Sequence, residues 1–306
     1  MFEGSEKIID VALRPNCDSL RELPPQFWQE LVAACGADIL SVVHHQSCDA
    51  YLLSESSLFV WHDRVRMLTC GDTLLSPALA TLIEKLGAAQ IGVASYQRKN
   101  EYRHQVSLAS FDQELIQLRQ VINGKGYRVG HLDSHHHYLF LAYGESSSRP
   151  APVTYELLMH HIDADVANQL RGSSLSVMHI RALLQLTELL PEFTIDDHLF
   201  SPFGYSVNGV NQAEYFTIHV TPEKAHSYVS FETNITAPQL LKRVSDALLA
   251  LFAPESWDVI AVNQHPVEHE LSGATQSTCS IVSEQSDNVQ FNHYQRNDIR
   301  LCCETL

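Results

Sequence analysis

A serine in a short polar turn is the residue of this chain best suited to unusual chemistry. Residues 51–60 read as two strands joined by Ser54-Glu55-Ser56-Ser57. A serine held on a strained bend can attack the carbonyl before it, convert that amide into an ester, and end as a covalently attached pyruvoyl group. A turn rich in serine and glutamate is by itself more often an ordinary solvated turn. Other residues of the chain are needed to distinguish between these two interpretations.

A cysteine and a histidine are further candidates. Cys70 lies where a strand ends at Gly71, which can leave the thiol exposed, and the alternative is a small buried cysteine. In residues 215–223 the alternation of a strand places His219 on the same face as Thr217. A histidine there is either a hydrogen-bonded structural residue or a group that transfers protons near neutral pH.

Two segments carry aromatic rings that could contact a ligand. Residues 200–209 combine aromatic side chains with a proline and two glycines, so they form either an anchored turn or a surface for a planar ring. At the N-terminus, Phe2-Glu3-Gly4-Ser5-Glu6 brings one ring and two carboxylates together, although chain ends are usually frayed.

The net charge argues against nucleic-acid binding, and the spacing of histidines and cysteines argues against metal binding. The chain has 20 Lys and Arg against 36 Asp and Glu, a net charge of −16, which argues against nucleic acid as a partner. This charge provides solubility or attracts a cationic substrate. Histidines cluster at 44–45, 135–137 and 160–161, but neighbours on a strand point to opposite faces and cannot converge on one ion. The seven cysteines lack CxxC spacing, so we expect free thiols and no metal.

The composition predicts a soluble, folded protein. Its 306 residues are 45% hydrophobic, enough for a large core in one or two domains. The start lacks the features of a signal peptide, and the apolar run 247–252 is far too short to span a membrane. We therefore expect a cytoplasmic protein without a membrane partner.

Strands that follow one another directly, interrupted by amphipathic helices, predict an α+β fold. We expect one helix from an N-cap at Ser76 to Gly87, a second over 110–122, and a third capped by Thr236. Residues 145–150 read as a linker between two similar halves, about 1–148 and 149–306. The expected architecture is a four-layer α/β/β/α sandwich of two antiparallel sheets with helices on the outer faces.

Taken together, these segments resemble one family, the eukaryotic-type S-adenosylmethionine decarboxylases, which are pyruvoyl enzymes that process themselves. The resemblance covers nearly the whole chain. It is carried by the segments Phe2–Lys7, Leu53–Ser57, Thr69–Gly71, Phe200–Gly209, Ile218–Glu223 and Ser227–Asn234.

The resemblance implies that a single domain, residues 1–306, cuts itself between Glu55 and Ser56. The Ser56 hydroxyl attacks the Glu55 carbonyl, β-elimination releases the small chain 1–55, and the dehydroalanine left on the large chain 56–306 hydrolyses to a pyruvoyl group and ammonia. Ser206 and His219 match the residues that assist this processing. A histidine suits the role because it can take and return protons.

The resemblance also implies the reaction. The pyruvoyl group, with no metal and no PLP, forms a Schiff base with S-adenosylmethionine and releases CO2, giving the aminopropyl donor for spermidine and spermine synthesis. Cys70 matches the proton donor. The other matching positions are Phe2 and Phe200 around the adenine, Glu223 on the ribose, Glu55 as a substrate contact, and Glu3 and Glu6 as active-site acids.

Two departures from the family concern activation by putrescine. Asp10, Glu156 and Glu232 match acidic residues that bind this diamine in some members, but Pro152 and Leu68 replace an aspartate and a lysine. We therefore expect weak or absent putrescine activation. Beyond the substrate and the chain's own two fragments, a homodimer is left open as a partner.

Two other functions compete with this one. A pyruvoyl decarboxylase of the same scaffold could act on another amino acid, but Phe2, Phe200 and Glu223 would then serve no nucleoside. A non-catalytic regulatory paralogue could instead pair with an active enzyme. The presence of Ser56, Cys70 and His219 opposes that alternative.

Overall fold

The computed structural model describes residues 6–54, 56–71, 73–99, 110–131, 136–172, 175–224, 227–268 and 274–297. The strands of these ranges form two eight-stranded sheets, A and B, and every strand pair in them is antiparallel. Sheet A consists of β1 (Lys7–Leu13), β2 (Ile39–His44), β3 (Cys48–Leu53), β4 (Ser56–Trp61), β5 (Arg64–Thr69), β6 (Ile91–Lys99), β7 (Gly124–Gly130) and β8 (His136–Tyr143). Sheet B consists of β9 (Thr154–His160), β10 (Thr194–Leu199), β11 (Tyr205–Asn211), β12 (Glu214–Thr221), β13 (Tyr228–Thr233), β14 (Ser256–Val262), β15 (Ala274–Val282) and β16 (Asn288–Arg296).

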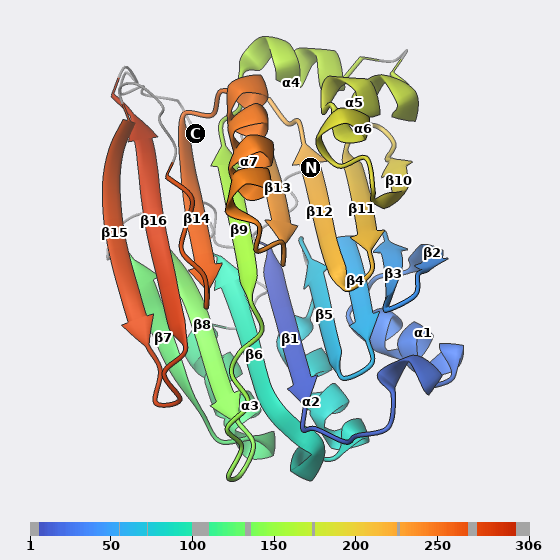
Figure 1. Ribbon diagram of the computed structural model, residues 1–306, viewed down its shortest axis with the longest axis vertical. Coiled ribbons are helices and arrows are strands. Elements are labelled where there is room, and N and C mark those ends of the chain that lie inside the picture. Colours follow the sequence, from blue (N-terminus) through green and yellow to red (C-terminus); the bar gives the residue numbers. More distant parts are fainter. Residues whose placement is uncertain are drawn as a thin grey trace.

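The two sheets have the same topology. The strand order of sheet A is β2-β3-β4-β5-β1-β6-β8-β7, and that of sheet B is β10-β11-β12-β13-β9-β14-β16-β15. Adding eight to each strand number of sheet A gives the order of sheet B. Residues 144–153 connect the last strand of sheet A to the first of sheet B. The molecule is thus built from two similar halves, as the sequence predicted (Figure 1).

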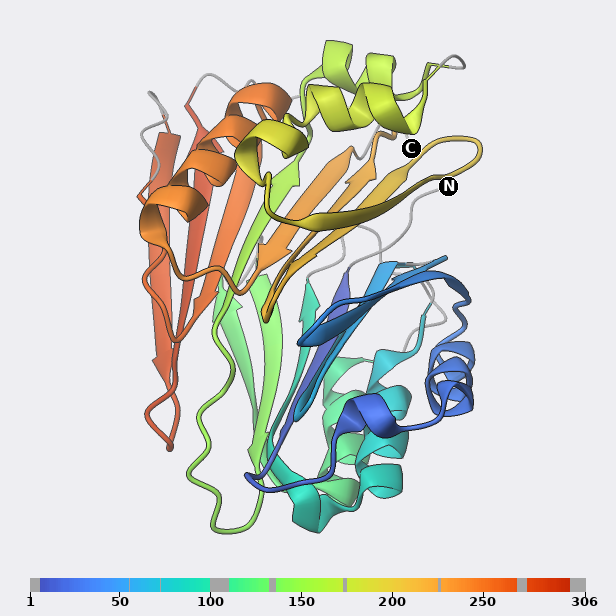
Figure 2. The ribbon, with the colours of Figure 1, turned by 45° about the vertical axis from the view of Figure 1, so that its right-hand side comes forward.

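Helices cover the outer face of each sheet. Sheet A is covered by α1 (Pro25–Ala34), α2 (Leu75–Leu86) and α3 (Phe111–Val121), and sheet B by α4 (Ala164–Leu170), α5 (Val177–Leu183), α6 (Leu186–Leu189) and α7 (Pro238–Phe252). Figure 2 shows α7 and the pair α2 and α3 on opposite outer sides of the two sheets. The fold is therefore the expected four-layer α/β/β/α sandwich.

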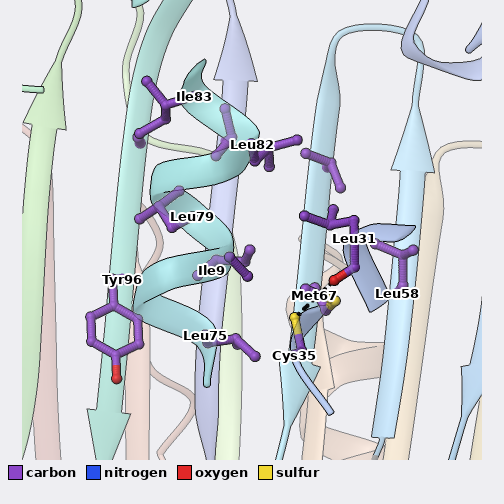
Figure 3. Close-up of a cluster of buried hydrophobic side chains, with 14 of the residues drawn as sticks. Ile9, Leu31, Cys35, Leu58, Met67, Leu75, Leu79, Leu82, Ile83 and Tyr96 are labelled. Atoms are coloured by element: carbon purple, nitrogen blue, oxygen red, sulfur yellow. Dashed lines mark hydrogen bonds between the residues drawn. The ribbon is translucent and has the colours of Figure 1, made fainter. Parts of the chain in front are cut away.

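Alternation along the strands divides the core into layers. Figure 3 shows the outer layer of sheet A, in which Leu75, Leu79 and Leu82 of α2 pack toward Ile9 and Met67 of the sheet. The opposite faces of the strands meet the other sheet. There, apolar residues of both sheets pack together, including Val93 and Leu139 of sheet A with Leu158, Ile260 and Phe291 of sheet B. The space between the sheets also holds most of the polar residues discussed below.

Two predicted helix caps are wrong. Helix α2 begins at Leu75, and Ser76 lies inside its first turn, where its hydroxyl donates to Glu114 Oε1 at 3.0 Å. Helix α7 has Ala237 at its N-cap, without a side-chain cap, and not Thr236. The Ser76 hydroxyl is thus used in a tertiary contact, and α7 begins at Pro238, whose fixed φ suits the first helical position. Gly87 ends α2 with a φ of 86°, as glycine allows.

Candidate active site

Ser56 begins β4 in a strained conformation. Its φ is 145°, a value that favours glycine and is unfavourable for serine. Successive strand residues normally point to opposite faces. Here the hydroxyls of Ser56 and Ser57 both lie near His219 of the other sheet, at 2.9 and 3.3 Å from Nε2. The bend therefore turns Ser56, which is 3% exposed, into the space between the sheets.

His219 is held between two serine hydroxyls. Its Nδ1 lies 2.8 Å from Ser206 Oγ, and the two residues are directly opposite on β12 and β11. Its Nε2 faces Ser56. Burial lowers the pKa of His219 to about 4, against the opposing charge of Glu6, so the ring is neutral at physiological pH. A neutral imidazole beside a buried hydroxyl can accept its proton.

The strand register brings Glu6 and Cys70 to the same end of sheet A. Thr69 lies opposite Ser56 on β5, and Lys7 lies opposite Thr69 on β1. Cys70 and Glu6 are the next residues beyond this row. The Cys70 loop is held in place because Lys7 Nζ donates to the carbonyl of Gly71 at 2.7 Å.

Glu6 is a buried carboxylate with a cation beside it. Its Oε2 lies 2.9 Å from Lys99 Nζ and accepts from the Tyr228 hydroxyl at 2.9 Å. Burial would raise the pKa of Glu6, but the charge of Lys99 lowers it to about 2. Glu6 is therefore charged at neutral pH and adds negative potential beside His219.

Phe200 and Glu223 lie on loops at the His219 end of sheet B. Phe200 follows β10, and its N–H donates to the carbonyl of Gly204 at 2.8 Å. Glu223 follows β12, two residues after Thr221, which by alternation shares the face of His219. Both are partly exposed, as expected for residues that contact a substrate. Phe2, Glu3 and Glu55 lie outside the described residues.

The sequence interpretation missed several buried polar residues in this space. Ser57 and Asn208 form hydrogen bonds beside His219 together with Thr217, which alternation had already placed on the His219 face. Lys99 and Tyr228 hold Glu6. For Asn208 the available signal was the alternation itself, because this residue is two positions from Ser206 on β11.

A second polar cluster between the sheets surrounds Arg66, which is 1% exposed. Its guanidinium donates to Asp10 at 2.9 Å, to Glu156 at 2.8 Å and to Glu232 at 2.6 Å. Burial disfavours the charge on Arg66, but these carboxylates raise its pKa well above the usual value. A cavity of about 20 Å³ beside Arg66, partly lined by Asp10 and Pro152, has room for one water molecule.

Other features of the described residues bear on ligands and location. Within those ranges, no group of three or more His, Cys, Asp or Glu side chains is arranged to hold a metal ion. Cys17, Cys35, Cys48, Cys70 and Cys279 are free thiols. None of the helices that the structure describes has the length and apolar character needed to cross a bilayer.

Comparison with known proteins gives the family. The sequence profile of Adenosylmethionine decarboxylase matches residues 1–304. The chain belongs to the adenosylmethionine decarboxylase family. Its relatives include the S-adenosylmethionine decarboxylase proenzyme of Dictyostelium discoideum, 32% identical over 79% of this chain and 70% of that protein. The proenzyme of Xenopus laevis is 34% identical over 86% of this chain and 84% of that protein.

A solved structure supports the fold of this decarboxylase family member. The crystal structure of the Trypanosoma brucei AdoMetDC-delta26 monomer superposes with a TM-score of 0.62 at 24% identity, covering 78% of this chain and 98% of that one. The two share the sandwich fold.

Proposed function

We propose that this chain is a self-processing S-adenosylmethionine decarboxylase whose pyruvoyl group comes from Ser56. The observation that carries the proposal is the contact between the strained, buried Ser56 and the neutral imidazole of His219, 2.9 Å from Oγ to Nε2. It joins a nucleophile, a base and a bent backbone at the position that the family uses for cleavage.

In the proposed processing, His219 accepts the Ser56 proton while Oγ attacks the carbonyl carbon of Glu55. The new C–O bond replaces the C–N bond, and the proton passes to the freed amine of Ser56. Loss of the Ser56 α-proton then breaks the Cβ–O bond and releases chain 1–55 as a carboxylate. Addition of water and loss of ammonia leave the pyruvoyl group on chain 56–306. Ser206 supports this by fixing the imidazole through Nδ1.

In turnover, the pyruvoyl group would supply an electron sink for the electrons left by the departing CO2. We assign to Cys70 the return of a proton to the substrate carbon, since the register places it one residue beyond the row that contains Ser56. Glu6, charged and buried at the same end, suits a cationic sulfonium. We assign Phe2 and Phe200 to the adenine, Glu223 to the ribose, and Glu3 and Glu55 to further substrate contacts.

We also propose that putrescine activates this enzyme weakly or not at all. Asp10, Glu156 and Glu232 already share the guanidinium of Arg66, so a built-in cation occupies the acids that a diamine would need. The adjoining cavity is too small for a diamine. Decarboxylation should be equal with and without millimolar putrescine, and a several-fold increase would contradict the proposal.

The experiment that tests the main proposal is mass spectrometry of the purified protein after denaturing electrophoresis. We expect two chains divided between Glu55 and Ser56, the larger with a pyruvoyl group in place of its first residue. One intact chain would favour the regulatory paralogue. A Cys70→Ala variant should be cleaved normally but release CO2 from S-adenosylmethionine slowly, and undiminished turnover would exclude Cys70 as the acid.

A further inference from the structure

A buried hydrogen-bond network of Ser57, Thr217 and Asn208 lies beside His219 and has no role in the steps above. Ser57 Oγ donates to Oδ1 of Asn208 at 2.6 Å and lies 3.2 Å from Thr217 Oγ1. Thr217 Oγ1 in turn lies 2.8 Å from Nε2 of His219. The three residues are at most 1% exposed, so solvent cannot replace any of these partners.

Asn208 fixes which atoms donate and which accept in this hydrogen-bond network. Its Nδ2 donates to the carbonyl of Tyr51 at 3.1 Å, which fixes the orientation of the amide and leaves Oδ1 toward Ser57. An amide oxygen can only accept a hydrogen bond. The Ser57 proton therefore points to Asn208, and toward Thr217 the Ser57 oxygen can act only as an acceptor.

Ser57 Oγ also lies 3.3 Å from Nε2 of His219, but its proton is directed to Asn208, so the hydroxyls of Ser56 and Thr217 are the two that compete for the lone pair of this nitrogen. Ser56 Oγ and Thr217 Oγ1 lie at nearly the same distance from Nε2, 2.9 and 2.8 Å. A neutral imidazole has a single acceptor nitrogen. If Thr217 donates to Nε2, Ser56 cannot transfer its proton there. If Thr217 donates to Ser57, the lone pair is left for Ser56, and the new Nε2–H finds an acceptor in Thr217 Oγ1.

We propose that Asn208, Ser57 and Thr217 are positioning residues for self-cleavage: they direct the Thr217 proton away from His219, so that Nε2 accepts the proton of Ser56. The inference rests on the proposed self-cleavage and deepens it. The proton balance is that of the first step above, in which Nε2 takes the proton from Oγ and passes it to the amine released from Glu55.

A double-variant experiment tests this role. Ser57→Ala removes the acceptor of the Thr217 proton, which then turns to Nε2, so cleavage should slow about tenfold or more. Adding Thr217→Val removes the competing donor, so the double variant should be cleaved faster than Ser57→Ala alone. If the residues only support the packing, the second substitution should leave cleavage as slow or slower, and that result would overturn the proposal.

The measurement is the time course of cleavage of the full chain made by cell-free translation, followed by denaturing electrophoresis and mass spectrometry. Ser230→Ala is the matched control. Ser230 lies opposite His219 on β13 and is 1% exposed, and its hydroxyl has no hydrogen-bond partner in the part of the chain that the structure describes. The control should be cleaved like the wild type.

The outcomes separate the two proposals. Cleavage of Ser57→Ala at the wild-type rate would overturn the positioning role and leave the proposed function standing, whereas an uncleaved wild-type chain would overturn the proposed function itself. If Ser57→Ala fails to fold, Asn208→Leu replaces it. This variant frees the Ser57 proton to turn to Thr217 Oγ1 or to His219 Nε2, 3.2 and 3.3 Å away, so its cleavage should also be slow. Cleavage at the wild-type rate would count against the positioning role.

Discussion

The two halves of the molecule place a hairpin turn at the same point of each sheet, and only one of them is proposed to break. Strands β3 and β4 join through two residues, with Leu53 opposite Ser56. Strands β11 and β12 do the same, with Asn211 opposite Glu214. In this correspondence Glu55 matches Ala213, and Ser56 matches Glu214. Both halves therefore contain this turn, but only the first half has a serine at the proposed cleavage position.

The second turn is held by hydrogen bonds to its backbone. The carbonyl of Ala213 accepts from Trp61 Nε1 at 3.0 Å and from Asn234 Nδ2 at 2.9 Å. Gln212 inside this turn is left-handed, with a φ of 53°, whereas Ser56, which follows the first turn, itself has a φ of 145°. We therefore attribute the proposed reactivity of the first turn to strain at the nucleophile and to a nearby base, and not to the hairpin as such.

The largest effect is expected when the first turn loses its nucleophile. Without the Ser56 hydroxyl no ester can form, so Ser56→Ala should remain a single chain with no detectable decarboxylation. Mass spectrometry of the purified variant checks this. Ser54→Ala is the control from the same turn; it removes only the acceptor for the Asp38 N–H at 3.0 Å, and cleavage should continue. Fragments from Ser56→Ala would show that another residue attacks.

Removing the base should have the next largest effect. His219→Ala should slow cleavage by about 100-fold or more, the usual contribution of a positioned general base. The neutral form accepts the proton, and burial lowers the pKa of His219 to about 4. The wild-type rate should therefore be constant above about pH 5 and fall as the pH drops through 4. A decline already near pH 6.5 would mean that His219 keeps an ordinary pKa, which contradicts this prediction.

The first turn illustrates what the sequence can predict. Alternating residues and the polar Ser54-Glu55-Ser56-Ser57 segment predicted two strands and a bend, and the bend is present. The alternation also placed Thr217 and His219 on one face. It could not predict that Asn208 meets Ser57, because that contact depends on how one sheet packs on the other.

Arg66 illustrates what the sequence conceals. In Arg64-Val65-Arg66-Met67 the alternation is typical of a strand with one face in water. The second sheet instead covers that face, and Arg66 is buried against carboxylates from three strands, two of them in the other sheet. Pairing of charges across the space between the sheets is a long-range property, so local pattern carries no signal for it.

A smaller effect is expected where the second turn loses one hydrogen bond. Trp61→Phe keeps most of the ring packing with Tyr215 but removes the donor to Ala213. On a Ser56→Ala background, which keeps the chain whole, urea unfolding should give a free energy of unfolding lower by about 1 kcal/mol. In the otherwise wild-type chain, cleavage at Ser56 should be unchanged. A slower cleavage would mean that the two ends of the sandwich are coupled.

The smallest effect is expected from giving the second turn a nucleophile. Glu214→Ser places a serine after Ala213, as Ser56 follows Glu55, in a turn of the same length. No cleavage at Ala213 should be detected by mass spectrometry, because residue 214 has a negative φ and the imidazole that serves Ser56 lies farther along β12, at position 219. The first turn of the same molecule, cleaved at its normal rate, is the internal control. A fragment ending at Ala213 would show that a serine in this hairpin is sufficient, and the roles assigned to strain and to His219 would then have to be abandoned.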